Sequence, residues 1–247
     1  MLSKVGSYKY RVYVCDFTGK ATLPVIGDFI IQASITHAQE RGFGYDAMIQ
    51  SNAAWVLSRL SVEMKEYPEY NQDVTVETWV EGVDRYFTQR CFSFINQAGE
   101  IMGYARSIWA AIDMKTRRPL DIPTWRPDLL DFIDTEKECQ CQIEKMEKIP
   151  AVDDVEPAMG YSVRYSDIDI NKHMNSVKYM EHVINVFDLS VFKQNFIRRF
   201  EIVYLQEGKF GDKLKLYKQD VSENESIIDT KRCEESVCRT RIIWQEK

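Results

Sequence analysis

Polar side chains alternate along one short segment, DIDINKHMNS, which covers residues 167–176. It places Asp169, Asn171, His173 and Asn175 two residues apart, in a chain that has three histidines. A histidine among carboxylate and amide groups can exchange a proton near neutral pH. A solvated polar loop, in which His173 is a hydrogen-bonded surface group, is the alternative. The segment is therefore a candidate site for acid–base chemistry.

The residues that follow this segment predict a helix over 175–190. Asn175 is a suitable N-cap, and the backbone N–H groups of Asn175, Ser176 and Val177 would lie at the positive end of the helix dipole. Such groups can stabilise the oxyanion that forms when a carbonyl is attacked, so a base beside them is an arrangement typical of hydrolases. The apolar residues on one helical face are Val177, Met180, Val183, Ile184 and Phe187.

Composition limits the classes of protein that fit. With 247 residues, 45% of them hydrophobic, the chain can bury a large core in one or two domains. The net charge of -6 and the acidic pI argue against a nucleic-acid partner. No run approaches ~20 apolar residues and the amino terminus lacks a signal-peptide pattern, so we expect a cytoplasmic protein without a membrane span. The six cysteines lack metal-site spacing, and we expect neither a metal nor a cofactor.

Two similar halves follow one another along the chain. In each half a strand, a helix and then several alternating strands succeed one another, and the halves finish on RSIW and RIIW. We therefore expect an α+β fold in which each helix is wrapped by its own antiparallel sheet; one large irregular domain is the alternative. The expected domains are 1–134 and 158–247, with a linker over 135–157. Strands are predicted at 9–16, 55–64, 75–80, 90–96, 102–113 and 161–167, and the first helix within 26–44.

The segment SDIDINKHMNSVKYMEHV resembles the catalytic segment of plant and bacterial fatty acyl-acyl carrier protein thioesterases. The likeness extends in order and spacing over nearly the whole chain, through GFGYDAMIQSNAAWVLSRLSVEMKEYP, DVTVETWVEG, GEIMGYARSIWAAIDMKTRRPLDIP and YLQEGKFGDKL. It implies two tandem hotdog domains and hydrolysis of fatty acyl-acyl carrier protein to free fatty acid and acyl carrier protein. The first domain would select the acyl chain and the second would carry the catalytic groups.

The resemblance also implies roles for single residues. Asp169, Asn171 and His173 would belong to the catalytic network, with Glu207 as an acidic partner that activates water together with His173. Which of His173 and Glu207 is the primary base is left open, and a glutamate that merely flanks a turn is the alternative for Glu207. Many plant members have a cysteine where this chain has Gly208, so a water nucleophile is favoured here. Asp167 is expected to position the loop, outside the catalytic set.

Further residues are expected to bind the substrate and its carrier. Ile31, Ile35, Trp55 and Trp79 are candidates for lining an acyl tunnel, although such residues are more often ordinary core. A second set is expected to form a basic docking face for acyl carrier protein, unless its members are only solvated charges; it comprises Arg117, Arg118, Arg198 and Arg199. Competing readings are an acyl-CoA thioesterase of the same fold and a non-catalytic acyl-binding hotdog module. The sequence does not determine the acyl chain length, and it leaves open whether the protein forms a homodimer.

Overall fold

The structure, a computed structural model, describes residues 3–134 and 141–247. The backbone divides into two compact units, Met1–Glu144 and Lys145–Lys247. The division between them lies within residues 135–157, which the sequence assigns to a linker. Among the described residues, no helix combines the length and the apolarity that crossing a membrane requires.

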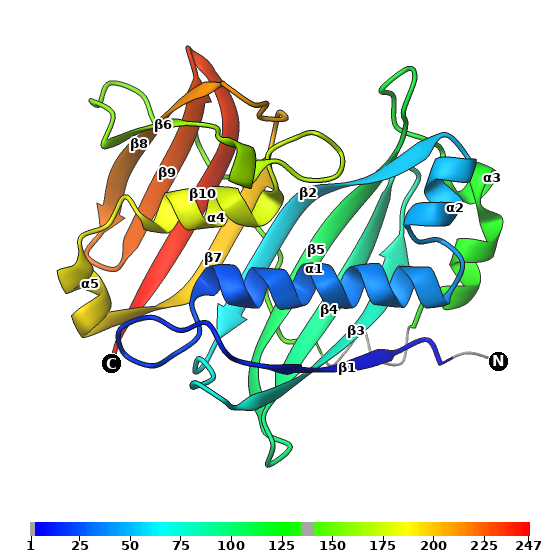
Figure 1. Cartoon of the computed structure of the whole chain (residues 1–247), viewed down its shortest axis with the longest axis horizontal. Helices are drawn as coiled ribbons and strands as arrows, with labels where there is room; N and C mark the ends of the chain where they lie inside the picture. The colour runs from blue at the N-terminus through cyan, green and yellow to red at the C-terminus, as the bar shows by residue number, and fades with distance from the viewer. Residues whose placement is uncertain (1–2, 135–140) are drawn as a thin grey trace. The chain divides into compact units, whose positions relative to one another are not determined.

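The first unit is an antiparallel sheet with a long helix across one face (Figure 1). The strands lie in the order β1-β3-β4-β5-β2, and each neighbouring pair is antiparallel. Its elements are β1 (Gly6–Arg11), α1 (Leu23–Glu40), α2 (Tyr45–Gln50), β2 (Ala53–Met64), β3 (Asp73–Val83), β4 (Phe87–Ile95), β5 (Ile101–Asp113), α3 (Ile122–Trp125) and the 3-10 helix η1 (Pro127–Phe132).

The second unit repeats this arrangement on a smaller scale. Its strands lie in the order β7-β10-β9-β8-β6, again with antiparallel neighbours. Read from β6, this is the same order as in the first unit, so the α+β class and the internal repeat expected from the sequence are confirmed. Its elements are β6 (Met159–Ser162), the 3-10 helix η3 (Tyr165–Asp167), α4 (Ser176–Ile184), α5 (Leu189–Gln194), β7 (Asn195–Tyr204), β8 (Lys213–Ser222), β9 (Glu225–Arg232) and β10 (Glu235–Glu246).

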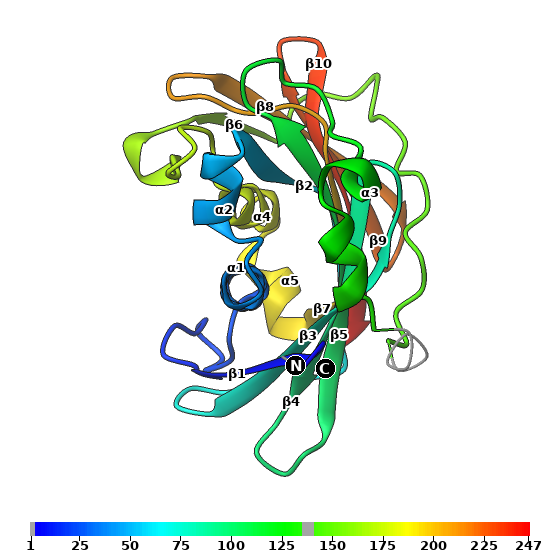
Figure 2. The same ribbon diagram turned by 90° about the vertical axis from the view of Figure 1, so that its right-hand side faces the viewer.

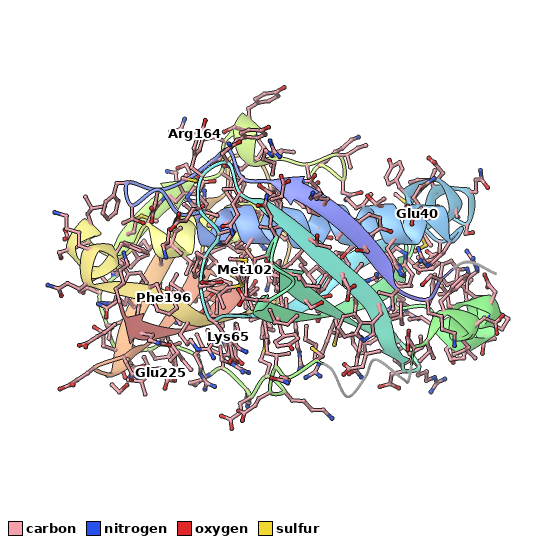
Figure 3. All side chains as sticks on the ribbon, turned by 90° about the horizontal axis from the view of Figure 1, so that it is seen from below. Glu40, Lys65, Met102, Arg164, Phe196 and Glu225 are labelled. Atoms are coloured by element: carbon pink, nitrogen blue, oxygen red, sulfur yellow. The ribbon has the colours of Figure 1, made fainter. Side chains whose placement is uncertain are left out.

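Helix α1 owes its position to one apolar face. Pro24 lies in its first turn, where a missing N–H costs no helical hydrogen bond, and Gly42 follows its end with a φ of 76°. Ile26, Ile30 and Ala33 recur at helical spacing and are fully buried. In Figure 2 the helix is seen end-on, on one side of the strands of its own sheet, and Figure 3 shows side chains filling the space between the ribbons. The helix and the sheet thus share one core.

Two elements of the second unit differ from the sequence prediction. The strand predicted over 161–167 ends at Ser162, because Asp167 turns back to accept hydrogen bonds from the Tyr161 hydroxyl and, at 2.6 Å, from the Arg164 N–H. The helix predicted over 175–190 divides in two, because the Asp188 side chain caps a new helix by accepting from the Ser190 N–H at 2.8 Å. Short polar side chains that bond to nearby backbone interrupt both patterns.

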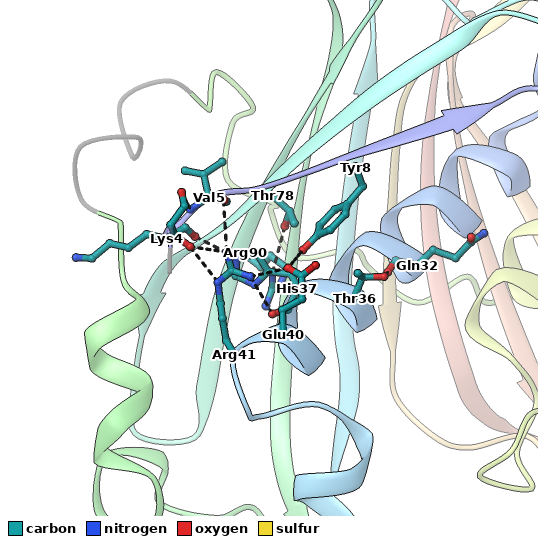
Figure 4. A network of polar contacts seen from close by, with 11 residues as sticks. Lys4, Val5, Tyr8, Gln32, Thr36, His37, Glu40, Arg41, Thr78 and Arg90 are labelled. Carbon is teal, nitrogen blue, oxygen red and sulfur yellow. Dashed lines mark hydrogen bonds and ion pairs between the residues drawn. The ribbon is translucent and has the colours of Figure 1, made fainter. Parts of the chain in front are cut away.

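A polar network is buried at the C-terminal end of α1 (Figure 4). His37, fully buried, bonds through Nε2 to the Lys4 carbonyl at 3.0 Å. Arg41 donates to the carbonyls of Ser3 and His37, and Arg90 of β4 donates to the Thr78 hydroxyl at 3.2 Å. Burial and the neighbouring guanidinium groups lower the pKa of His37 to about 3, so the imidazole is neutral at physiological pH.

Candidate active site

The loop between η3 and α4 is held in one conformation by the side chain of Asp169. Its Oδ1 accepts the backbone N–H groups of Asn171 at 2.8 Å and His173 at 3.3 Å. The Asp169 N–H donates to the His173 carbonyl at 2.9 Å, which closes the loop, and Lys172 at its tip has a φ of 66°. Asp169 therefore fixes the backbone from which the His173 ring projects. Asn171 is exposed, and its hydrogen bond to Asp169 uses the backbone N–H and not the side-chain amide.

The loop brings His173 to Glu207, a residue 34 positions further along the chain. The His173 Nε2 and Glu207 Oε2 atoms are 3.1 Å apart, and their side chains are 25% and 32% exposed. The Met174 N–H donates to the Gly208 carbonyl at 2.8 Å, so a backbone hydrogen bond joins the two segments directly beside the pair. A histidine in contact with a carboxylate, still reached by solvent, can take a proton from water and return it.

The start of α4 lies directly after this pair. Asn175 is the N-cap, as the sequence predicts, and its Oδ1 accepts the Val177 N–H at 2.8 Å. The Asn175 N–H itself donates to the Asp167 carbonyl at 2.7 Å. Of the three backbone donors expected to bind an oxyanion, Asn175 and Val177 are thus engaged within the protein. In the described part of the chain the Ser176 N–H makes no such bond, so it is the donor of the three that could bind an oxyanion.

A second histidine–carboxylate contact supports the loop from inside. Asp167 is 3% exposed, and its Oδ1 lies 3.7 Å from Nε2 of His182 on α4. The rings of Tyr161 and His182 are in contact, tilted by 32° to one another with centroids 3.6 Å apart. Burial tends to raise the pKa of Asp167, but the bonds from Tyr161 and the Arg164 N–H outweigh it and the pKa is lowered. The sequence analysis placed Asp167 outside the catalytic set, in a role that positions the loop. It did not identify Tyr161 and His182, which contact Asp167.

A shallow groove of about 570 Å³ runs beside Asp169. It is lined by Tyr165, Ser166, Ile168 and Phe210 as well as Asp169. Tyr165 is 89% exposed and Phe210 is 70% exposed, an unusual degree of exposure for aromatic side chains. Of the residues discussed for the site, Asp169 is the one that lines this groove. Among the described residues, no cluster of three or more histidine, cysteine, aspartate or glutamate side chains could hold a metal ion.

The residues expected to line an acyl tunnel occupy different environments. Trp55 is half-buried, and its indole N–H donates to the Phe43 carbonyl at 2.9 Å. Ile31 is half-buried on α1, whereas Ile35 is 56% exposed because it lies on the face of α1 turned away from the core. Trp79 is buried beside Cys91, Cys141 and Ile143.

Trp79 lies on the outer face of its sheet. Thr78, the residue before it, points to the α1 side, where it bonds to Arg90 close to His37. Side chains alternate along a strand, so Trp79 faces the other way. The structure therefore does not place Ile35 or Trp79 between helix and sheet, and their expected lining role stays a prediction.

The expected docking residues also differ from one another. Arg117 and Arg118 are exposed in the turn after β5, where Arg117 has a φ of 61°. Arg199 instead forms an ion pair with the buried Glu201, with Nη2 and Oε1 2.6 Å apart. Arg199 therefore binds a carboxylate inside the unit, and its expected role as a docking residue stays a prediction. Arg198 is half-buried.

Comparison with known proteins places the chain in a family. Residues 4–129 match the model of the acyl-ACP thioesterase N-terminal domain, and residues 152–246 match that of the C-terminal domain. An acyl-ACP thioesterase of known structure from Bacteroides thetaiotaomicron is 37% identical and superposes with a TM-score of 0.89, over 98% of each chain. The 12:0-ACP thioesterase from Umbellularia californica, at 21% identity, superposes with a TM-score of 0.85 over 100% of this chain and 99% of its own, a likeness of fold.

A curated relative shows the same likeness in sequence. Oleoyl-acyl carrier protein thioesterase 2, chloroplastic, from Arabidopsis thaliana is 27% identical over 217 residues, which are 82% of this chain. The match covers 59% of that relative, so this chain spans somewhat more than half of its length. The hotdog architecture expected for both halves is confirmed by the solved structures. The two family models together cover most of the sequence, and the chain belongs to the acyl-ACP thioesterase family.

Proposed function

We propose that this chain hydrolyses the thioester of fatty acyl-acyl carrier protein to free fatty acid and acyl carrier protein. The observation that carries the proposal is the 3.1 Å contact between His173 Nε2 and Glu207 Oε2 beside the start of α4. Membership of the acyl-ACP thioesterase family supports acyl carrier protein as the carrier and the thioester as the bond that is hydrolysed. The relatives include oleoyl- and palmitoyl-acyl carrier protein thioesterases, which supports a long acyl chain.

The proposed reaction begins with a water molecule beside the His173–Glu207 pair. The pair removes a proton from the water as its oxygen bonds to the thioester carbonyl carbon. The carbonyl oxygen becomes an oxyanion, which the Ser176 N–H and the dipole of α4 stabilise. The carbon–sulfur bond then breaks, and the proton held by the pair passes to the leaving thiolate. The products are a carboxylic acid and a free thiol, and the pair returns to its starting state.

Water is the nucleophile in this proposal because the cysteines of the second unit are badly placed. The position after Glu207 is Gly208, which has no thiol. Cys238 is fully buried, and burial raises the pKa of its thiol to about 12. Cys233 is exposed in the turn between β9 and β10. The proposal therefore needs no covalent acyl-enzyme intermediate.

Steady-state hydrolysis of acyl-acyl carrier protein and acyl-CoA thioesters of graded chain length tests the proposal. We expect His173→Ala and Glu207→Gln each to lower kcat by about 10²–10⁴-fold, the range for loss of general acid–base catalysis. Glu66→Gln is the matched control, because Glu66 is the exposed glutamate at the corresponding point of the first unit. Wild-type rates in both active-site variants would refute the mechanism. A preference for acyl-CoA would move the substrate to that carrier without changing the chemistry.

A further inference from the structure

The peptide group between Glu207 and Gly208 is held at both of its polar atoms. The Gly208 N–H donates to the hydroxyl oxygen of Tyr179 at 2.8 Å, and the Glu207 carbonyl accepts from Arg232 Nη1 at 3.3 Å. Arg232 is anchored in turn by Asp212 at 2.7 Å. The Cα of Glu207 is bonded directly to this peptide group. The orientation of the peptide therefore limits the positions that the Glu207 carboxylate can occupy.

Tyr179 is a rigid partner for this peptide. It lies on α4, is 4% exposed, and meets the ring of Tyr204 edge-on with centroids 5.7 Å apart. The hydroxyl of Tyr204, at the end of β7, donates to the Ser176 carbonyl of α4 at 2.9 Å, which holds the Tyr204 ring against that helix. Burial raises the pKa of Tyr179, so its hydroxyl stays neutral and can accept the Gly208 N–H.

Gly208 is required by this close approach and not by its backbone torsions. A Cβ built on Gly208 would lie 2.6 Å from the Tyr179 hydroxyl oxygen and 3.3 Å from Met174 Cβ. The Gly208 carbonyl also accepts the Met174 N–H at 2.8 Å, so the residue cannot move away freely. Any side chain at position 208 would therefore push the Tyr179 hydroxyl out of place.

We propose that the Tyr179 hydroxyl is a positioning group, which fixes the Glu207–Gly208 peptide so that Glu207 meets His173. Gly208 is needed for the same contact, because only a glycine leaves space for the Tyr179 hydroxyl. This inference rests on the proposed hydrolase function, since it assigns Tyr179 a part in the same site. Tyr179 itself acts through Glu207 and need not touch the substrate. A displacement of about 1 Å at catalytic groups can lower a rate by 10²-fold, which sets the scale of the expected effect.

Tyr179→Phe removes the acceptor while keeping the ring. We expect kcat to fall by about 10- to 100-fold with KM changed by less than about two-fold, because Tyr179 is buried and acts through Glu207 without touching the substrate. Tyr217→Phe is the matched control, since Tyr217 is a half-buried tyrosine of the same unit whose ring contacts Lys231 instead. Amide hydrogen exchange at Gly208 should become faster in Tyr179→Phe and stay unchanged in Tyr217→Phe.

A double-mutant cycle separates positioning from general packing. Gly208→Ala should lower kcat in the wild-type background, because the new Cβ displaces the hydroxyl. In the Tyr179→Phe background the same substitution should cost clearly less, because the atom that Cβ would meet first is gone. Additive losses of kcat would overturn the proposal, as would a Tyr179→Phe enzyme with wild-type kcat and unchanged Gly208 exchange. A wild-type protein without activity on any thioester would overturn the hydrolase function instead, and the exchange measurement would still decide whether Tyr179 holds the peptide.

Discussion

His37 should make the stability of the first unit depend on pH. Its ring is enclosed by groups from three elements: Arg90 from β4, Arg41 and Glu40 at the end of α1, and Tyr8 from β1. Glu40 accepts the Tyr8 hydroxyl at 2.6 Å and lies 3.1 Å from Arg41, so its charge is already matched. A positive charge on His37 would therefore be added in a buried site next to two guanidinium groups.

The size of the effect follows from the two pKa values of His37. An unfolded histidine titrates near pH ~6.5, and the folded one has a pKa of about 3. Because the folded pKa is the lower one, the unfolded chain binds an additional proton between these values. The stabilisation is therefore fully present above about pH 6.5 and is lost as the pH falls. Well below pH ~6.5, each pH unit lowers the free energy of unfolding by about 1.4 kcal/mol. We therefore expect this free energy to fall by about 2 kcal/mol between about pH 6.5 and pH 5.

His37→Gln isolates this contribution. Glutamine keeps an N–H that can donate to the Lys4 carbonyl but does not titrate, whereas the carboxylates of the chain are the same in both proteins. Urea unfolding should be followed by tryptophan fluorescence, since four of the five tryptophans belong to the first unit. Between about pH 7 and pH 5 the wild type should lose about 2 kcal/mol more than His37→Gln. Equal losses would show that His37 is not held neutral by its surroundings.

Three further substitutions test other parts of the structure. Arg199→Ala leaves the buried Glu201 with the more distant Arg241 as its partner, and should lower the free energy of unfolding by about 3 kcal/mol; a rise in KM for acyl carrier protein substrates at full stability would instead support the docking role. Asn175→Ala removes the cap that accepts the Val177 N–H and should cost about 1 kcal/mol in urea unfolding, with Asn175→Asp close to wild type. Cys233→Ser should keep wild-type kcat if water is the nucleophile, and a loss beyond about ten-fold would implicate the thiol.

The repeat was predictable because it follows from burial on sheets. Strands with one buried face alternate every second residue, and this pattern located β2 to β5 to within a few residues of their observed ends. The prediction failed where a polar side chain competes for the backbone, as Asp167 does at the end of β6 and Asp188 does after α4. Periodicity does not report such local bonds. The short helices α2 and α3 were also missed, because four to six residues are too few to show a period.

The candidate site was only partly visible in the sequence. His173 and its polar neighbours stand out by spacing, and the family resemblance led to Glu207. The sequence did not mark Tyr179 or Arg232 as site residues. A tyrosine on a helix is usually a core residue, and an arginine at the end of a strand is usually exposed to solvent. Their contacts with residues 207–208 join segments separated by 25 residues or more, which no local pattern records.

The two units have one topology, yet the chemistry that the proposal needs is suited to the second. Both place a helix after the first strand, so both present a helix N-terminus. In α1 the N-cap Thr22 makes no side-chain bond to the first turn, and residues 12–22, which lead into the helix, contain no histidine. In α4 the Asn175 side chain caps the helix and the Ser176 N–H lies at its start. A duplicated scaffold therefore supplies equivalent positions, and the residues placed around the helix start decide which copy suits the proposed chemistry.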